Sequence, residues 1–196
     1  NDVLDGGEGN DNLNGGDGVL DTINETANTN FTLTNSSLTR STGEVDTLNN
    51  IEVANLVGGA GSNTFTLTGW TGSGSLNGGG GDDTLVWAAD ADFLLSDVAL
   101  TVTPAAGPPV SNFTLSSIES ATLTGGPSDN KLNAAAFTGD TLLTGGDGKD
   151  ELIGGAGFDI LRGGLGNDTL TGNRSNDVID GGAGTDTLVE DLSLAI

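Results

Sequence analysis

The feature that most constrains this chain is a nine-residue repeat that runs without a gap through residues 145–189. The successive units read GGDGKDELI, GGAGFDILR, GGLGNDTLT, GNRSNDVID and GGAGTDTLV. Four of them follow the pattern GGxGxDxUx, in which U is apolar, and the unit that begins at Gly172 has lost its second and third glycines. A fixed short period is typical of solenoids, in which each repeat packs against its neighbours.

The residue types within one repeat predict a glycine turn followed by a short β-strand. Adjacent glycines adopt positive φ angles and let two backbones approach closely, so the GGxGxD half suits a tight turn. The last three residues suit a strand whose central apolar side chain points into the core. That apolar position is occupied by Leu152, Leu161, Leu170, Ile179 and Leu188. The sequence therefore predicts an all-β array of short strands separated by glycine turns.

Repeats also organise the rest of the chain. The N-terminal region carries GGEGNDNLN and the imperfect GGDGVLDTI within residues 6–23. Residues 51–86 align without gaps with residues 118–153, so the middle holds two copies of a 67-residue unit. Strand-like segments such as FTLT, TFTLT, DTLVW and ATLT run through these copies. We expect one continuous solenoid composed of N-terminal repeats (1–24), duplicated spacer units (25–144) and a C-terminal repeat block (145–196).

The composition excludes several classes of function. The chain has 28 acidic and 5 basic residues, and its net charge of −23 repels nucleic acid and anionic membranes. It has no His and no Cys, which excludes Ser-His-Asp catalysis, imidazole metal sites, thiolate chemistry and disulfides. No apolar run approaches the roughly 20 residues of a membrane span. We therefore expect a protein that is not an enzyme, binds no nucleic acid and does not insert into a membrane.

The same composition favours a bound cation. Glycine supplies 34 of 196 residues, and each one costs roughly 0.5–1 kcal/mol more than alanine to order. A glycine-rich chain that also repels itself stays disordered unless something else stabilises it. One glycine turn cannot complete the roughly six to eight oxygen ligands of Ca²⁺. Two stacked turns can, through backbone carbonyls and the aspartate that ends each turn, so the repeat predicts several calcium ions between stacked turns.

The units within residues 1–23 and 145–189 resemble the RTX (repeats-in-toxin) calcium-binding family. This resemblance implies a right-handed parallel β-roll with two nonapeptides per coil, so that each turn stacks on the turn two repeats away. It implies that a lower turn provides the carbonyls of repeat positions two and four together with its position-six aspartate. The turn above provides the carbonyls of positions one and three and its own aspartate. The resemblance also implies a bacterial protein that leaves the cell by type I secretion.

Carried onto this sequence, the resemblance implies three calcium sites in the C-terminal block and two in the spacer units. The first would use Gly146, Gly148, Asp150, Gly163, Leu165 and Asp168, and the second Gly164, Gly166, Asp168, Gly181, Ala183 and Asp186. The third, on the opposite side, would use Gly155, Gly157, Asp159, Gly172, Arg174 and Asp177. The spacer sites, weaker because Asn replaces one Asp, would use Gly59, Gly61, Asn63, Gly78, Gly80 and Asp83, or Gly126, Ser128, Asn130, Gly145, Asp147 and Asp150. At the N-terminus an inserted residue leaves the register open, and the candidates are Asp2, Asp11, Asp17 and Asp21.

Several features have plainer interpretations. A metal-free solenoid would also need glycine turns, but it does not explain an Asp at position six of every C-terminal unit. Trp70 and Trp87 are expected in the core rather than on a sugar-binding surface, and the Thr-rich strands lack the regular ranks of an ice-binding face. Glu44 and Glu52 have no repeat partner and are expected at the surface or as acceptors for backbone N–H groups.

The expected function is structural. Calcium sites that fill only outside the cell would leave the chain unfolded in the cytosol and fold it after secretion. We expect a segment of a secreted adhesin, surface-layer or extracellular-fibre protein. The alternative is the folding and secretion module of an RTX toxin or secreted enzyme, which a catalytic domain elsewhere in the full-length protein would indicate. Because the array starts in mid-repeat, end-to-end self-association is a further hypothesis, which light scattering with and without calcium tests.

Overall fold

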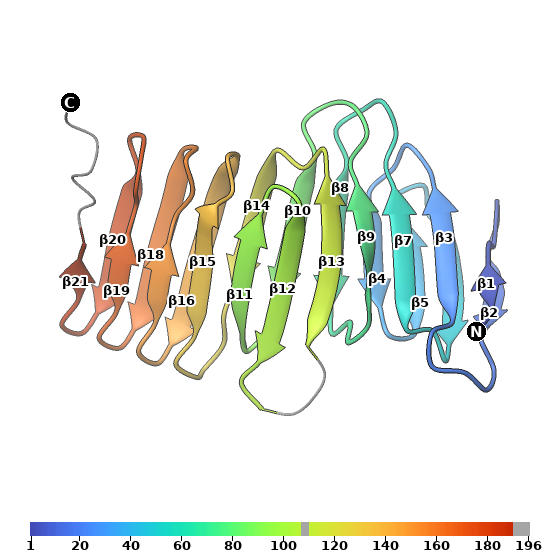
Figure 1. Ribbon diagram of the computed structural model, residues 1–196, viewed down its shortest axis with the longest axis horizontal. Helices are drawn as coiled ribbons and strands as arrows, with labels where there is room; N and C mark the ends of the chain where they lie inside the picture. The colour runs from blue at the N-terminus through green and yellow to red at the C-terminus, as the bar shows by residue number, and fades with distance from the viewer. Residues whose placement is uncertain (107–109, 190–196) are drawn as a thin grey trace. The chain divides into compact units, whose positions relative to one another are not determined.

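The fold is built from short β-strands joined by turns (Figure 1). The computed structural model describes residues 1–106 and 110–189, and every regular element in these ranges is a strand. No helix there is long and apolar enough to cross a membrane. The chain divides into two compact units: unit 1 comprises Asn1–Val86 and Ser111–Ile118, and unit 2 comprises Trp87–Val110 and Glu119–Ile196. The all-β prediction is confirmed for the described residues.

Unit 1 contains strands of two sheets. The first runs in the order β1 (Val3–Leu4), β3 (Thr22–Thr26), β7 (Val53–Val57), β9 (Ser73–Asn77) and β13 (Ser111–Ser116), and all of these pairs are parallel. The second runs in the order β2 (Asn12–Asn14), β6 (Val45–Asn49), β5 (Ser37–Arg40), β4 (Phe31–Thr34), β8 (Thr64–Thr68) and β10 (Thr84–Ala88). Except at β4, β5 and β6, which lie in one sheet, the chain alternates between the two sheets, as a coil requires.

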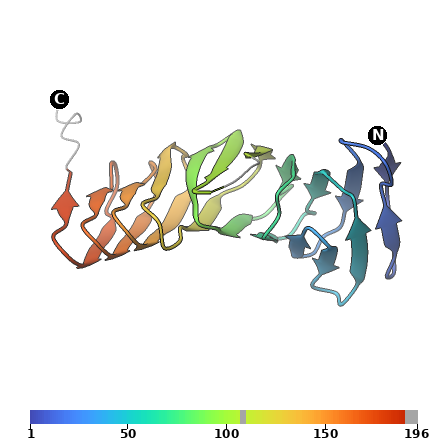
Figure 2. The ribbon, with the colours of Figure 1, turned by 90° about the horizontal axis from the view of Figure 1, so that it is seen from below.

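Unit 2 repeats this arrangement with a more regular pitch. One sheet runs β12 (Ala99–Pro104), β11 (Ala91–Ser96), β15 (Lys131–Ala136), β17 (Glu151–Ile153), β19 (Thr169–Thr171) and β21 (Thr187–Leu188). The other runs β14 (Ser120–Thr124), β16 (Asp140–Asp147), β18 (Asp159–Leu165) and β20 (Val178–Ala183). Figure 2 shows the coils from β16 onward as successive orange and red turns. From β17 and β18 on, each residue pairs with its counterpart two repeats later, as two nonapeptides per coil require.

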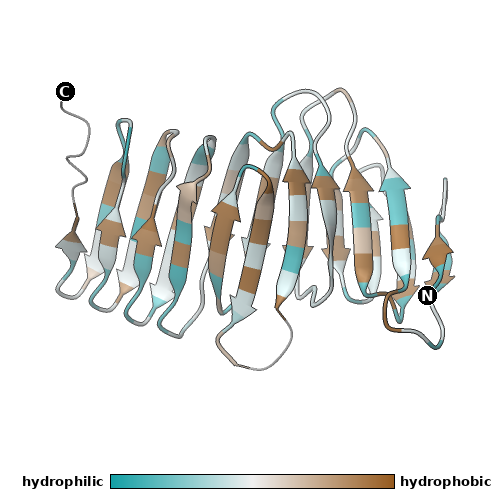
Figure 3. Ribbon diagram, in the orientation of Figure 1, coloured by the Kyte–Doolittle hydropathy of each residue, from teal (hydrophilic) through white to brown (hydrophobic). Residues whose placement is uncertain are grey.

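The core lies between the two sheets of each unit, and alternation along the strands fills it. Figure 3 shows apolar and polar bands alternating along most strands. Leu152, Leu161 and Leu170, at the apolar position of their repeats, are at most 1% exposed, and the two tryptophans are also buried. Ile179 is only half-buried and Leu188 is 54% exposed, so the prediction that these two side chains lie in the core is wrong. In the described residues no further coil covers them.

Antiparallel strands interrupt the parallel sheets at two places. In unit 1, β4, β5 and β6 form an antiparallel meander, and β4 and β6 then pair in parallel with β8 and β2. In unit 2, β11 and β12 form a hairpin, and β11 pairs in parallel with β15. The turn residues Asn35 and Asp97 each accept a backbone N–H, from Thr71 and Thr138 respectively. These hairpins change which residues lie beside the glycine turns.

Candidate metal sites in the glycine turns

The repeated turns hold glycine in backbone conformations that other residues rarely adopt. In the turns that end at Asp150, Asp168 and Asp186, the glycines at positions two and four all have positive φ. The angles are 120° and 107° for Gly146 and Gly148, 114° and 138° for Gly164 and Gly166, and 89° and 144° for Gly182 and Gly184. An L-residue is strained at such angles. The turn conformation therefore favours glycine at positions two and four of the repeat.

The glycine at position one is required by the aspartate of its own turn. A Cβ on Gly163 would collide with Oδ2 of Asp168 and with the carbonyl of the next coil's Gly181. A Cβ on Gly145 would likewise collide with Oδ2 of Asp150. The position-six carboxylate therefore lies against the first residue of its own turn, close to the backbone of the neighbouring coil.

Stacked coils are linked by a ladder of aspartates. The N–H of Asp150 donates to Oδ1 of Asp168 at 2.8 Å, and the N–H of Asp168 donates to Oδ1 of Asp186 at 3.0 Å. The N–H of Asn130 donates to Oδ1 of Asp150 at 2.8 Å. Each rung thus joins position six of one turn to position six of the next. The structure brings together the position-six residues that the sequence assigned to the first two C-terminal sites.

The second oxygen of two of these aspartates is buried without a hydrogen-bond partner. Asp150 and Asp168 are each 1% exposed, and Oδ2 of both lacks a donor. Burial raises the pKa of Asp150 to about 6; the hydrogen bond from Asn130 opposes this shift, and repulsion from Asp168, Asp129 and Asp147 adds to it. A buried, unpartnered carboxylate is costly unless it is neutralised or coordinates a metal.

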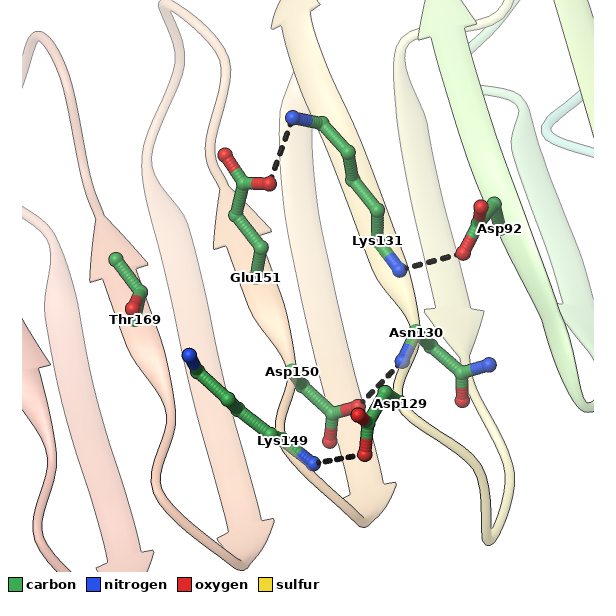
Figure 4. A pocket seen from close by; sticks show the side chains of 8 residues that line it. All are labelled: Asp92, Asp129, Asn130, Lys131, Lys149, Asp150, Glu151 and Thr169. Atoms are coloured by element: carbon green, nitrogen blue, oxygen red, sulfur yellow. Dashed lines mark hydrogen bonds and ion pairs between the residues drawn. The ribbon is translucent and has the colours of Figure 1, made fainter.

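The cationic side chains near Asp150 are directed elsewhere. Figure 4 shows Lys131 beside Glu151, and the distance from Nζ to Oε2 is 2.7 Å. The backbone N–H groups of Lys131 and Lys149 donate to Asp92 and Asp129. Neither amine donates to Oδ2 of Asp150, which has no hydrogen-bond partner, so the position is suited to a cation from solution.

Most ligands at such a position must be backbone carbonyls. Among residues 1–106 and 110–189, no three acidic side chains converge closely enough to hold a metal by themselves. Carbonyls lie close to the neighbouring coil, because a Cβ on Gly164 would meet the carbonyl of Gly146, and a Cβ on Gly182 that of Gly164. Stacked carbonyls and a carboxylate form the all-oxygen environment that Ca²⁺ prefers. The residues of these turns therefore fit calcium.

The opposite turn, which ends at Asp159, is different. Its position-two glycine, Gly155, donates its N–H to Oδ2 of Asp159 at 2.7 Å. Thr141 donates its N–H and its hydroxyl to Oδ1, at 3.0 and 2.6 Å. Burial raises the pKa of Asp159, and these three hydrogen bonds oppose the shift. The N–H of Asp159 still donates to Asp177 at 3.0 Å, but the carboxylate of Asp159 already has its donors. We call this arrangement a self-bonded turn.

The two spacer turns are also self-bonded. Oδ1 of Asn63 accepts the N–H of Gly59 at 2.8 Å, and Oδ1 of Asn130 accepts that of Gly126 at 2.7 Å. The amide nitrogens donate in turn, from Asn63 to Asn28 at 3.4 Å and from Asn130 to Asp90 at 3.3 Å. The polar atoms of each asparagine thus have hydrogen-bond partners without a cation. This is the physical reason to expect the spacer sites to be weaker.

The other residues assigned to the spacer sites also come together. The N–H of Asn63 donates to Oδ1 of Asp83 at 2.7 Å, so the turn of Gly59 and Gly61 stacks on that of Gly78 and Gly80. The carbonyls of Gly59 and Gly126 accept N–H groups from Gly80 and Asp147, at 2.8 and 3.0 Å. Ser128 donates its N–H and hydroxyl to Asp90.

The N-terminal candidates fall into two groups. Asp21 is fully buried; its Oδ1 accepts the N–H of Asp2 at 2.6 Å, and its Oδ2 has no partner. Asp11 also has an unpartnered Oδ2, whereas Asp17 is exposed. The N–H of Asp21 donates to Glu52 at 2.9 Å, as expected of Glu52 as an N–H acceptor.

One acidic residue that contacts these turns has no repeat motif to indicate it. The N–H of Asp11 donates to Oδ1 of Asp46 at 3.0 Å, although Asp46 lies in no nonapeptide. The sequence signal was only a DTL segment, which indicates a strand. Glu44, in contrast, accepts the N–H of Gly9 at 3.1 Å, in agreement with the expectation for that residue.

The degraded repeat keeps the turn conformation without its glycines. Asn173 and Ser175, at positions two and four, have φ angles of 72° and 89°. The Asn173 side chain donates from Nδ2 to the carbonyl of Gly154 at 2.6 Å, which compensates its strain. The turn conformation is therefore kept here by residues that do not favour it.

Replacing Ser175 with glycine is expected to stabilise the fold by about 1 kcal/mol, because glycine adopts a φ of 89° without strain. The midpoint of urea unfolding at saturating calcium should rise. The matched control is Asn173→Gly, which relieves similar strain but loses the hydrogen bond to Gly154, so its gain should be smaller. A lower midpoint for Ser175→Gly would contradict the assignment of strain to this residue.

Comparison with known proteins agrees with this geometry. The family model of the RTX calcium-binding nonapeptide repeat matches four copies, at residues 1–19, 66–94, 138–161 and 153–188. A search of curated proteins found no match. The matched segments include the turns that end at Asp11, Asp83, Asp150, Asp168 and Asp186. Because the matches cover about half of the chain and coincide with the stacked turns, this chain belongs to the RTX calcium-binding nonapeptide repeat family.

Proposed function

We propose that this chain is a calcium-binding structural β-solenoid that folds when it meets extracellular calcium. The observation that carries the proposal is the pair of buried, unpartnered carboxylate oxygens on Asp150 and Asp168 within stacked glycine turns. The proposed architecture is a right-handed β-roll with ions between turns that lie two repeats apart. The best sites are the two that share Asp168, and the self-bonded turns hold calcium more weakly or not at all.

The mechanism is the coupling of ligand binding to folding. Without a cation, the ladder places the carboxylates of Asp150, Asp168 and Asp186 in one column, and each turn must also order its glycines. Calcium bound between the turns would supply the positive charge and the oxygen coordination that this column lacks. Because the unfolded chain has no preformed site, the free energy of binding becomes free energy of folding.

Such coupling favours a protein that works outside the cell. Extracellular calcium modules typically bind with a Kd of about 10⁻⁴ to 10⁻³ M, so weak sites remain empty in the cytosol and fill after export. RTX repeats are typical of secreted bacterial proteins, and the family is structural rather than catalytic. The same turn chemistry recurs at Asn63 and Asn130, the equivalent positions of the two spacer copies. This recurrence supports a repeated spacer segment of an adhesin, surface layer or extracellular fibre.

A calcium titration followed by circular dichroism tests this proposal. In excess EGTA the signal should be that of a largely unfolded chain, and a β-sheet signal should appear cooperatively as calcium is added. Magnesium is the control: it demands a smaller octahedral shell and keeps its waters, so the same concentration should not fold the chain. A chain that is already fully β-structured in EGTA would refute calcium-coupled folding.

A further inference from the structure

Arg40 places a buried positive charge among acidic side chains in unit 1. Only 2% of its side chain is exposed. Nη2 lies 2.6 Å from Oε2 of Glu25 and 2.9 Å from Oδ2 of Asp46, and Nη1 lies 3.5 Å from Oε2 of Glu44. Glu25 and Asp46 are themselves 8% and 0% exposed. A buried arginine of this kind is retained only where its charge is matched.

Asp46 has the same relation to the first glycine turn that Asp168 has to a later one. Asp11 donates its N–H to Oδ1 of Asp46 at 3.0 Å, and Asp150 donates its N–H to Oδ1 of Asp168 at 2.8 Å. The two sites differ at the second carboxylate oxygen of the aspartate that accepts this N–H. Oδ2 of Asp168 is buried without a partner, whereas Oδ2 of Asp46 is bound by Arg40.

The guanidinium also reaches the turn below. Nη1 of Arg40 donates to the carbonyl of Gly9 at 3.4 Å. Gly9 is at position four of its repeat, and the carbonyl at this position is one of the ligands that the RTX scheme assigns to calcium. Arg40 therefore contacts both kinds of oxygen that a calcium ion would contact: a carbonyl of the lower turn and the carboxylate above it.

The antiparallel meander is what brings Arg40 to this position. Arg40 is the last residue of β5, and β6 follows it in the chain. β6 pairs in parallel with β2, the strand that comes directly after the first glycine turn. The segment stacked on that turn is thus residues 44–46 rather than another GGxGxD unit. A second glycine turn is missing here, and the carboxylates of Glu25, Glu44 and Asp46 surround the cation in place of its carbonyls.

The charge on Arg40 is permanent. Burial alone would lower the pKa of the guanidinium, but the hydrogen bond to Glu25 and the attraction of Glu25, Asp46 and Glu44 raise the pKa above its ordinary value. Unlike a bound ion, this cation is covalently tethered and does not depend on the calcium concentration.

We infer that Arg40 is a built-in substitute for calcium, which holds the first glycine turn against residues 44–46 where later turns would use an ion. The inference rests on the proposed calcium function of those later turns. It has two consequences: the contact around Arg40 persists without calcium, and removal of the guanidinium leaves Glu25, Glu44, Asp46 and the Gly9 carbonyl without a cation and free to close around a calcium ion.

The test is to count bound calcium ions in the full chain and in its Arg40→Ala variant, by isothermal titration with CaCl₂ and by native mass spectrometry. The variant should bind one more ion than the parent chain, and it should need calcium to order the segment around β5. The matched control is Arg162→Ala, which removes an exposed arginine and should leave the count unchanged. An unchanged count in Arg40→Ala would overturn the inference.

A measurement on the unaltered chain covers the case in which Arg40→Ala does not fold. In EGTA, hydrogen exchange at the amides of Asp11 and Thr47 should be at least about tenfold slower than at those of Asp150 and Asp168. Equal exchange at the two places would overturn the inference. If calcium neither binds nor slows exchange at Asp150 and Asp168, the proposed function itself fails, and this outcome is distinct from a failure at Arg40 alone.

Discussion

Replacing Asp168 with asparagine is expected to remove two bound calcium ions and to raise the calcium concentration at the folding midpoint about tenfold or more. Asp168 belongs to both of the best candidate sites, because its N–H bonds to Asp186 and its Oδ1 accepts from Asp150. Interactions with a charged group contribute about 1.5–3 kcal/mol, and about 1.4 kcal/mol changes an equilibrium tenfold. Replacing this one carboxylate with a neutral amide should therefore weaken the binding of two calcium ions.

The asparagine variant tests the effect of the negative charge while the shape of the side chain is kept. The new side chain keeps an oxygen for the Asp150 N–H and has nearly the same volume, and the chain itself already uses asparagine at position six in Asn63 and Asn130. The control is Asp180→Asn, which neutralises an exposed aspartate in the following coil. It should leave the number of bound ions unchanged in isothermal titration. A loss of no ions in Asp168→Asn would show that the carboxylate is not a shared ligand.

The second large effect is expected for Gly166→Ala, which should destabilise the calcium-bound fold by about 3 kcal/mol. The φ of Gly166 is 138°, a conformation that costs other residues about 1–3 kcal/mol. A Cβ there would also collide with the carbonyl of Gly148 in the preceding coil, and a backbone atom cannot move aside as the end of a flexible side chain can. The coil would have to separate from its neighbour, so calcium coordination between them should suffer as well.

Gly43→Ala is the matched control for this prediction. Gly43 also has a positive φ, of 103°, but no atom lies within 4 Å of the position that its Cβ would take. Its replacement should cost only about 1 kcal/mol for the backbone conformation. The free energies of urea unfolding of both variants at saturating calcium separate the cost of backbone strain from the cost of the Cβ collision. Equal losses in the two variants would mean that close stacking of the coils contributes little.

The regular parts of the fold could be predicted because short-range rules determine them. Alternation of polar and apolar residues places strands at segments such as FTLT and TFTLT, and the nonapeptide period sets a register of two repeats between stacked strands. Leu152, Leu161 and Leu170 are buried as their repeat position requires. Ile179 and Leu188 occupy the same position but are not fully buried, because burial depends on a neighbouring coil and not on the repeat itself.

The hairpins and the differences among turns could not be predicted in this way. Two-residue turns at Asn35 and Asp97 lack the Asn-Gly or Asp-Gly signal of a tight hairpin, so the antiparallel strands left no clear mark in the sequence. Self-bonded turns differ from the turns of Asp150 and Asp168 in which donor reaches the position-six side chain, and Thr141 reaches Asp159 from the neighbouring coil. Arg40 meets Asp46 and Gly9 only after the meander folds.

The positive-φ glycines have a consequence for how such a chain can evolve. Backbone geometry restricts repeat positions one, two, four and six, while positions three and five point outward. At position three the C-terminal units carry Asp147, Leu165 and Ala183, and at position five Lys149, Asn167 and Thr185, all of them exposed. The exposed side chains of stacked repeats thus already differ in charge, size and polarity on one constant backbone. Selection can therefore change the outer surface one repeat at a time without altering the turns and strands beneath it.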